Sequence, residues 1–251
     1  MLEPLSASLA QALSGLGPAA AGVAFVAGLM RGFAGFGSAM FMAPIFAVIF
    51  GSAEMIATVA AMELAVSVQL FPAARRGCQW RIVGPMAVAA IVFLPVGRWL
   101  LLGVDATILA KAVALIVLGF VAIMLSGWTY RGDKGPVGAA LVGAVSGTMT
   151  ATTSVGGPPV LLYLLSGRDA REIGRANIIT FYFVTHIALV ALFLATGTVG
   201  AAAVVRGVLL FPFMLVGAWI GGRLFGLATP ATFRYVALVI LATAGLFGLL
   251  R

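Results

Sequence analysis

The chain has 251 residues, of which 63% are hydrophobic and 9% are charged, and its mean hydropathy is +1.17. Soluble domains carry about a quarter charged residues, so this composition leaves no room for one and predicts an all-α, polytopic membrane protein in contact with the lipid bilayer. The formal net charge of +8 comes from cations scattered singly between apolar runs, as membrane loops require, and predicts no nucleic-acid partner. A single cysteine and a single histidine argue against a disulfide framework and a dedicated metal site, and we expect no metal and no cofactor.

The first hydrophobic segment covers about 17–50 and is interrupted by the glycine-rich stretch RGFAGFG at 31–37. The preceding MLEPLSASLAQ lacks a positively charged region, so we expect no cleaved signal peptide. Three uninterrupted segments follow at about 55–74, 82–102 and 107–127. Each approaches the roughly 20 residues that a membrane crossing needs, and the short links between them predict antiparallel neighbours.

The second interrupted segment, 135–166, lies in an uncharged run that would reach about 50 Å as one straight helix, against about 30 Å for the hydrocarbon core. Six of the nine residues 146–154 are Ser or Thr, and Gly-Gly-Pro-Pro follows at 156–159, where proline cannot continue a helix. A polar, broken backbone at membrane depth is tolerated where it is buried in protein or lines a wet cavity, which in transporters is usually the substrate site. Three further spans complete the chain at about 174–195, 201–222 and 230–250.

The two halves repeat each other. At an offset of 115, Gly28-x-x-x-Gly32 matches Gly143-x-x-x-Gly147 and Pro44 matches Pro159, and in the later spans the offset becomes 125. Aligned Gly, Pro and acidic positions in the same order favour a duplication over chance. We therefore predict two transmembrane repeats, 1–130 and 131–251, that together form one transmembrane domain.

The distribution of cations predicts how the interrupted segments lie in the membrane. If all eight segments cross, seven cations fall on each side. If each interrupted segment is a hairpin that enters and leaves on one side, ten cations fall on one side and four on the other. The positive-inside rule favours the second arrangement. We expect a multi-pass protein of the cell (inner) membrane with six full spans, two broken hairpins, inverted repeats and both termini extracytoplasmic.

Two stretches resemble the glycine-rich signatures of the sulfite exporter TauE/SafE family. The first is G-F-x-G-F-G-x-x-x-x-x-P, from Gly32 to Pro44. The second is Ser146-Gly147, then GGPP at 156–159 and LLY at 161–163, and Arg175-x-Asn177 in the next span also matches. At position 38–40 the chain has Ser-Ala-Met where many relatives carry a longer glycine run. The resemblance implies a permease or exporter for a small sulfur-containing anion, sulfite or an organosulfonate. The sequence leaves open whether the protein is a monomer or a homo-oligomer.

The residues of the interrupted segments fit an anion site. A half-helix that begins in mid-membrane exposes backbone N–H groups, carries partial positive charge and binds oxyanions. We expect the site to combine hydroxyl donors, glycines that shape the turns, and polar residues of the neighbouring helices. These residues are Arg31, Gly35, Gly37, Ser38, Thr150, Thr152, Thr153, Ser154, Gly156, Gly157, Arg175 and Asn177. The alternative for the small residues is close helix packing, the role expected for the two Gly-x-x-x-Gly pairs.

The charged residues within the spans each have two interpretations. Arg31 either binds the anion or extends to the membrane interface, and Arg175 either joins the site or belongs to the cytoplasmic cations. Glu63, in the middle of a span, either carries a coupling proton or pairs with an arginine. His186 either relays protons or serves as a structural hydrogen-bonding group.

An integral-membrane enzyme acting on a lipid-like substrate is the alternative function. Such enzymes usually show clustered carboxylates, a histidine set or a nucleophile with its base, whereas this chain has seven acidic residues and one histidine without a cluster. The sequence therefore predicts a transporter and no enzyme. A coupled carrier and a passive anion channel both remain open, because an anion leaving an inside-negative cell already moves downhill electrically.

Overall fold

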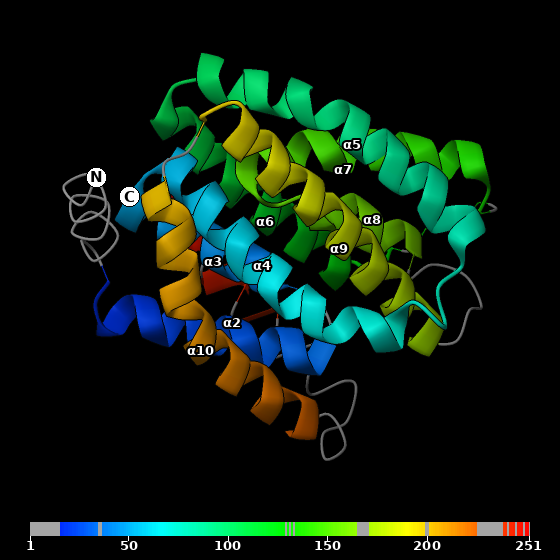
Figure 1. Ribbon diagram of the computed structural model, residues 1–251, viewed down its shortest axis with the longest axis horizontal. Helices are drawn as coiled ribbons and strands as arrows, with labels where there is room; N and C mark the ends of the chain where they lie inside the picture. The colour runs from blue at the N-terminus through cyan, green and yellow to red at the C-terminus, as the bar shows by residue number, and fades with distance from the viewer. Residues whose placement is uncertain are drawn as a thin grey trace.

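The computed structural model describes residues 16–34, 37–128, 130, 132, 134–164, 171–198 and 201–224, and short pieces between 238 and 250. Within these residues the fold consists of helices and short connections (Figure 1). The helices are α2 (Pro18–Ala34), α3 (Ser38–Phe50), α4 (Ser52–Ala74), α5 (Trp80–Gly103), α6 (Ala106–Leu125), α7 (Pro136–Thr153), α8 (Gly157–Leu164), α9 (Arg171–Ala195) and α10 (Ala201–Leu224).

Five of these helices, α4, α5, α6, α9 and α10, are long and apolar enough to cross a membrane. They coincide with five of the six predicted spans, with ends that differ by a few residues. The predicted span 230–250 falls mostly outside the described residues. The all-helical membrane architecture is confirmed.

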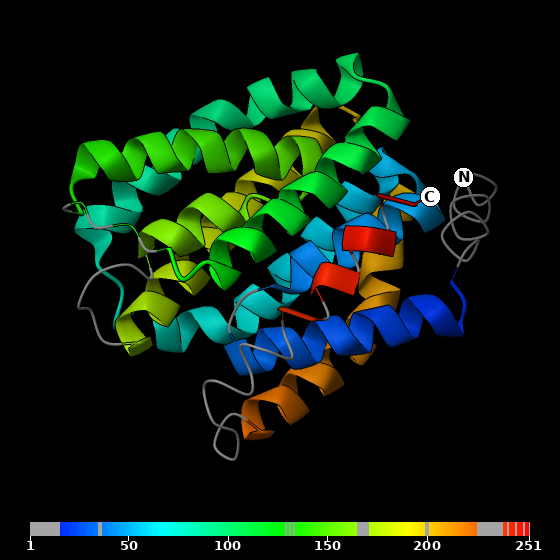
Figure 2. The same ribbon diagram turned by 180° about the vertical axis from the view of Figure 1, so that it is seen from behind.

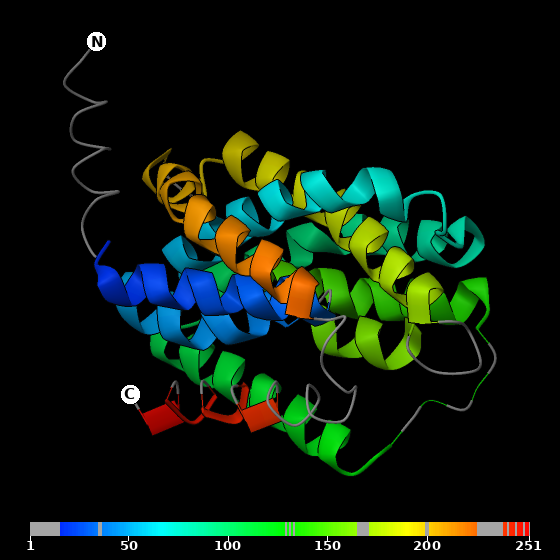
Figure 3. The same ribbon diagram turned by 90° about the horizontal axis from the view of Figure 1, so that it is seen from below.

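Each interrupted segment forms two helices, as predicted. Between α2 and α3, Gly37 has a φ of 93°, and between α7 and α8, Ser154 has a φ of 61°. Both values lie in the left-handed region, which an α-helix of L-residues does not use, so the helices end there. The two helices of each pair run in roughly opposite directions, so each pair forms a hairpin (Figures 2 and 3).

Glycines allow the first helix of each hairpin to pack closely on a helix of the other half. A Cβ atom at Gly28 or Gly32 of α2 would collide with the backbone of α10 at Met214 or Ala218. In α7, side chains at the two matching glycines, residues 143 and 147, would collide with the backbone of α5 at residues 86 and 90. The predicted packing role of both Gly-x-x-x-Gly pairs is confirmed.

These contacts also align the two packing partners. Met86 of α5 corresponds to Met214 of α10, and Ala90 to Ala218, so the offset is 214 − 86 = 128. The sequences MAVAA at 86–90 and MLVGA at 214–218 match at this offset. This contact offset of 128 is three residues larger than the sequence offset of 125, which comes from the Gly-Arg pairs further along the same two helices.

The outer surface carries large apolar side chains, as a lipid-facing surface requires. Val88, Val92 and Leu115 are among many that are exposed. Trp80 and Trp99 are exposed near opposite ends of α5. Nineteen residues separate them, which is about 29 Å of helix and close to the thickness of the hydrocarbon core. Such positions suit tryptophans that anchor a helix at the two membrane interfaces.

Candidate functional site

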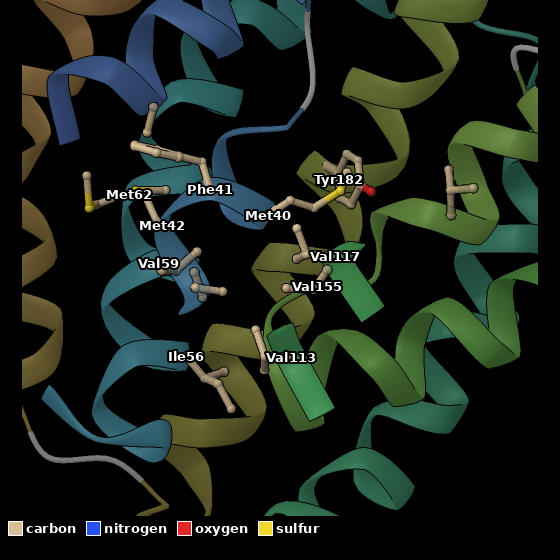
Figure 4. Packing of buried hydrophobic residues seen from close by; sticks show 14 of the residues in the cluster. Met40, Phe41, Met42, Ile56, Val59, Met62, Val113, Val117, Val155 and Tyr182 are labelled. Atoms are coloured by element: carbon tan, nitrogen blue, oxygen red, sulfur yellow. The ribbon is translucent and has the colours of Figure 1, made fainter. Parts of the chain in front are cut away.

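The two helix breaks meet inside the protein. A Cβ atom at Gly157, where α8 begins, would lie 2.9 Å from Cε of Met40 on α3 and 3.0 Å from the hydroxyl of Tyr182 on α9. Figure 4 shows Met40 beside Tyr182, with Val155 of the second break next to them. The N-terminal ends of α3 and α8 therefore face a common region, bounded by α9.

The two helix starts differ in the donors that they offer. The first backbone N–H groups of an α-helix have no partner within the helix. The backbone hydrogen bond from Phe41 N to Gly37 O opens the helical ladder of α3, so the N–H groups of residues 38–40 precede it. In α8 the second and third residues are Pro158 and Pro159, which have no N–H. The α3 end is thus the richer in donors.

Arg31, near the end of α2, is buried and has two partners on α4. Its Nη1 lies 3.5 Å from Oε2 of Glu63, and its Nη2 donates to Oγ of Ser67 at 3.1 Å. Glu63 also accepts a hydrogen bond on Oε1 from the hydroxyl of Ser38, the first residue of α3. The side chains of Arg31 and Glu63 are each 2% exposed. The network connects the first break to the middle of α4, and Arg31 does not extend to the membrane interface.

Helix α9 presents a stripe of polar side chains toward this network. Arg175, Tyr182 and His186 are spaced by seven and four residues, so they share one helical face. The Tyr182 ring centroid lies 5.8 Å from Cζ of Arg31. Nδ1 of the buried His186 lies 2.8 Å from the Tyr182 carbonyl oxygen, which only accepts, so Nδ1 carries the proton.

Arg175 lies beside the end of α2. Its Nη2 donates to the carbonyl oxygen of Gly32, the residue after Arg31, at 3.4 Å. Its Nε is buried and has no hydrogen-bond partner among the described residues. Two guanidinium groups thus lie at the same end of α2. Of these two, Arg31 alone pairs with a carboxylate among the described residues.

Most hydroxyls of the predicted Ser/Thr run donate to backbone carbonyls. Thr150 and Thr153 bond to the carbonyl oxygens of Ser146 and Met149, each at 2.7 Å. Thr152 lies 3.0 Å from the carbonyl oxygen of Gly97 on α5 and 2.8 Å from that of Thr148. A hydroxyl has one proton, so these groups reach an anion only after changing rotamer. Their geometry suits helix packing, the alternative role considered above.

Ser154 differs from the rest of the run. Its hydroxyl is buried and forms no hydrogen bond with any described residue, although buried polar atoms usually have a partner. It lies at the second break, in the left-handed conformation. Ser154 is therefore the member of this run with a hydroxyl to donate.

The remaining predicted residues lie in three settings. Gly156 packs against Thr150, because a Cβ atom there would collide with the threonine hydroxyl. Asn177 binds Gln79 twice, accepting from its backbone N at 2.7 Å and donating to its Oε1 at 2.9 Å, so it holds the α4–α5 connection. Gly35 lies outside the described residues.

Sequence reasoning missed two members of the network, Ser67 and Tyr182. Helical spacing indicates both, since Ser67 follows Glu63 by four residues and Tyr182 follows Arg175 by seven. A pocket of about 530 Å³ lies elsewhere, at the ends of α5 and α7, lined by Gln79, Trp80, Arg81, Ile82, Lys134, Gly135 and Pro136. Among the residues with described positions, no group of three His, Cys, Asp or Glu side chains is arranged to hold a metal.

Comparison with known families gives a match over nearly the whole chain. The model of the family described as sulfite exporter TauE/SafE matches residues 20–248. The chain belongs to the sulfite exporter TauE/SafE family. This family consists of membrane transporters of the sulfite-exporter type rather than enzymes. No curated protein and no solved structure matches the chain.

Proposed function

We propose that this TauE/SafE protein is a permease that exports a small sulfur-containing anion, sulfite or an organosulfonate, through a site at its two helix breaks. The observation that carries the proposal is the pair of guanidinium groups, Arg31 and Arg175, at the end of α2 beside the start of α3. Arginine binds tetrahedral and trigonal oxyanions with two hydrogen bonds at once. The α3 N–H groups, with Ser38 and Ser154, are further donors.

The proposed membrane arrangement follows from the two hairpins. If each hairpin enters and leaves on one side, three crossings separate the repeats 1–130 and 131–251, which are then inverted. The exchanged packing of α2 on α10 and of α7 on α5 supports a two-fold relation between the halves. The ten-to-four distribution of cations then puts both termini outside and the α4–α5 connection in the cytoplasm.

Burial of the site favours a carrier over an open channel. Arg31, Ser38, Glu63 and Ser154 are at most 2% exposed, so no wet path reaches them in this conformation. An anion enters only if the hairpins or α9 move, which is alternating access around a central site. His186 and Glu63 are the candidates for proton coupling in such a cycle.

Flux in liposomes tests the function. The purified protein is reconstituted, and the fluxes of sulfite, sulfate, thiosulfate, taurine and sulfoacetate are compared under a clamped potential. We expect transport of at least one of these anions, and its loss in Arg175→Gln. The matched control is Arg223→Gln, which also removes a guanidinium group near a helix end. Cζ of Arg223 lies 3.6 Å from the ring centroid of Trp219. Equal loss in both variants, or no flux of any anion, would contradict the proposal.

A further inference from the structure

The charges at the proposed site do not cancel. Arg31 and Arg175 each carry a positive charge, because arginine does not lose its proton in proteins. Glu63 is bound as a carboxylate, accepting from Ser38 and pairing with Arg31. Among the described residues of the site, these three groups together carry one net positive charge.

Within the part of the chain that the structure describes, other charged groups near α4 do not change this sum. On α9, Tyr182 faces the network as an uncharged phenol, His186 is counted with one ring proton, on Nδ1, and Glu172, three residues before Arg175, is exposed. On α10, Arg206 is neutralised by Glu54, which lies nine residues before Glu63 on α4. The distance between Arg206 Nη1 and Glu54 Oε2 is 2.9 Å. Arg223 stacks on Trp219 and is exposed. The charged residue of α6, Lys111, is exposed, and α3 and α7 contain no ionisable side chain.

A buried site is most stable when its charges balance, because an uncompensated charge in a low-dielectric interior is costly. One monovalent anion makes this site neutral, whereas a divalent anion leaves it with one net negative charge. We propose that the site is balanced for a singly charged oxyanion, and that a doubly charged oxyanion binds only when Glu63 takes up a proton. This inference rests on the proposed transport function and specifies the valence of its substrate.

The contacts of Glu63 explain why it is the group that takes up a proton when a doubly charged anion binds. Glu63 and an incoming anion compete for the same guanidinium, since Arg31 contacts the carboxylate at 3.5 Å. An anion that draws Arg31 away leaves the buried Glu63 carboxylate without its cation, and an unpaired buried charge is costly. A proton from solvent then restores neutrality. His186 is the competing proton acceptor, since among the described residues only its Nδ1 has a hydrogen-bond partner, the Tyr182 carbonyl oxygen.

Calorimetry on the wild-type protein in nanodiscs tests the inference without any variant. Methanesulfonate is monovalent and sulfate is divalent across pH 6–8, and paired buffers of different ionisation enthalpy report proton uptake. We expect methanesulfonate to bind without proton uptake and with an affinity that does not change with pH. Sulfate should bind with uptake of up to one proton, and its affinity should fall by up to roughly tenfold per pH unit as the pH rises. Sulfate binding with no proton uptake would overturn the inference, even if transport itself is intact.

Charge variants then identify the proton acceptor. Glu63→Gln raises the net charge to two, so sulfate should bind more tightly at pH 8 and lose its pH dependence. Adding Arg175→Gln to Glu63→Gln restores one positive charge and should restore the preference for methanesulfonate. The matched control is Glu54→Gln on the same helix, which also loses an arginine partner and should leave the pH profile unchanged. Proton uptake that persists in Glu63→Gln and disappears in His186→Gln would overturn the assignment to Glu63.

Discussion

Glu63 on α4 forms an ion pair with Arg31 on α2, with 3.5 Å between Oε2 and Nη1, and both side chains are almost fully buried. Breaking a buried pair leaves an uncompensated charge, which typically costs about 3–5 kcal/mol. The pair therefore stabilises one arrangement of the first hairpin against α4. In the proposed site, an anion at Arg31 would replace the carboxylate as its partner, which would link substrate binding to the position of the hairpin.

Replacing Arg31 tests its role in binding. Arg31→Gln should weaken anion binding by roughly 10- to 150-fold, the equivalent of about 1.5–3 kcal/mol for a hydrogen bond to a charged group. Arg31→Lys keeps the charge but loses the planar fork, so its effect should be intermediate. Because Arg31→Gln also leaves Glu63 without its cation, the double variant with Glu63→Gln controls for stability. Wild-type affinity in a folded Arg31→Gln protein would exclude Arg31 from the site.

In the Ser/Thr run, the Ser154 hydroxyl has no hydrogen-bond partner among the described residues, whereas the threonine hydroxyls already bond to backbone carbonyls. Ser154→Gly removes the hydroxyl and suits the φ of 61°, so it should lower anion affinity without loss of stability. Thr152→Val removes a bond to Gly97 on α5 and should lower the melting temperature more than the affinity. Binding and thermal unfolding are measured for both variants. The opposite pattern would assign Thr152 to the site and Ser154 to packing.

Substitutions at the packing glycines test whether the first helix of each hairpin packs on a helix of the other half. Gly32→Ala places a methyl group against the backbone of Ala218 and should destabilise the protein by about 1–3 kcal/mol. Gly147→Ala, at the matching contact with Ala90, should have a similar effect. Gly22→Ala on α2 meets no atom within 4 Å and should be neutral or stabilising by up to about 1 kcal/mol. A loss at Gly22 equal to that at Gly32 would contradict the packing role.

Cys78, the only cysteine of the chain, tests the orientation. Burial raises the pKa of its thiol above the ordinary value, and the side chain of Thr180 lowers it by less. Less thiolate forms at neutral pH, so maleimide labelling should be slow at pH 7 and faster at pH 8.5. An impermeant maleimide should reach Cys78 in inverted vesicles only. Ala106→Cys in a Cys78→Ser background should be labelled only from the outside, and reversal of both results would invert the topology.

The helix breaks could be predicted from sequence because their causes are local. Proline, glycine and hydroxyl-rich residues interrupt helices wherever the chain places them, and both breaks lie where these residues cluster. The close-packing glycines were equally visible as repeated spacings. Five span positions followed from hydrophobic length alone.

The partners within the site could not be predicted, because they depend on which helix faces meet. That Glu63 pairs with Arg31 depends on how α3 and α10, which each contact both α2 and α4, place these two helices, and spacing along the chain does not reveal this. The same holds for Thr152, whose hydroxyl contacts α5, and for Asn177, which binds Gln79. Composition indicated a polar run but not that Ser154 alone among its predicted donors keeps a hydroxyl without a described partner.

Anomalous scattering from bound selenate tests the central claim most directly, since selenium marks an oxyanion of sulfate geometry. Data from the full-length protein at pH 6 should show a selenium peak within hydrogen-bonding reach of both Arg31 and Arg175, next to the start of α3. Arg175→Gln should lose this peak. A peak at the separate pocket lined by Arg81 and Lys134, with none at Arg31, would contradict the proposed site.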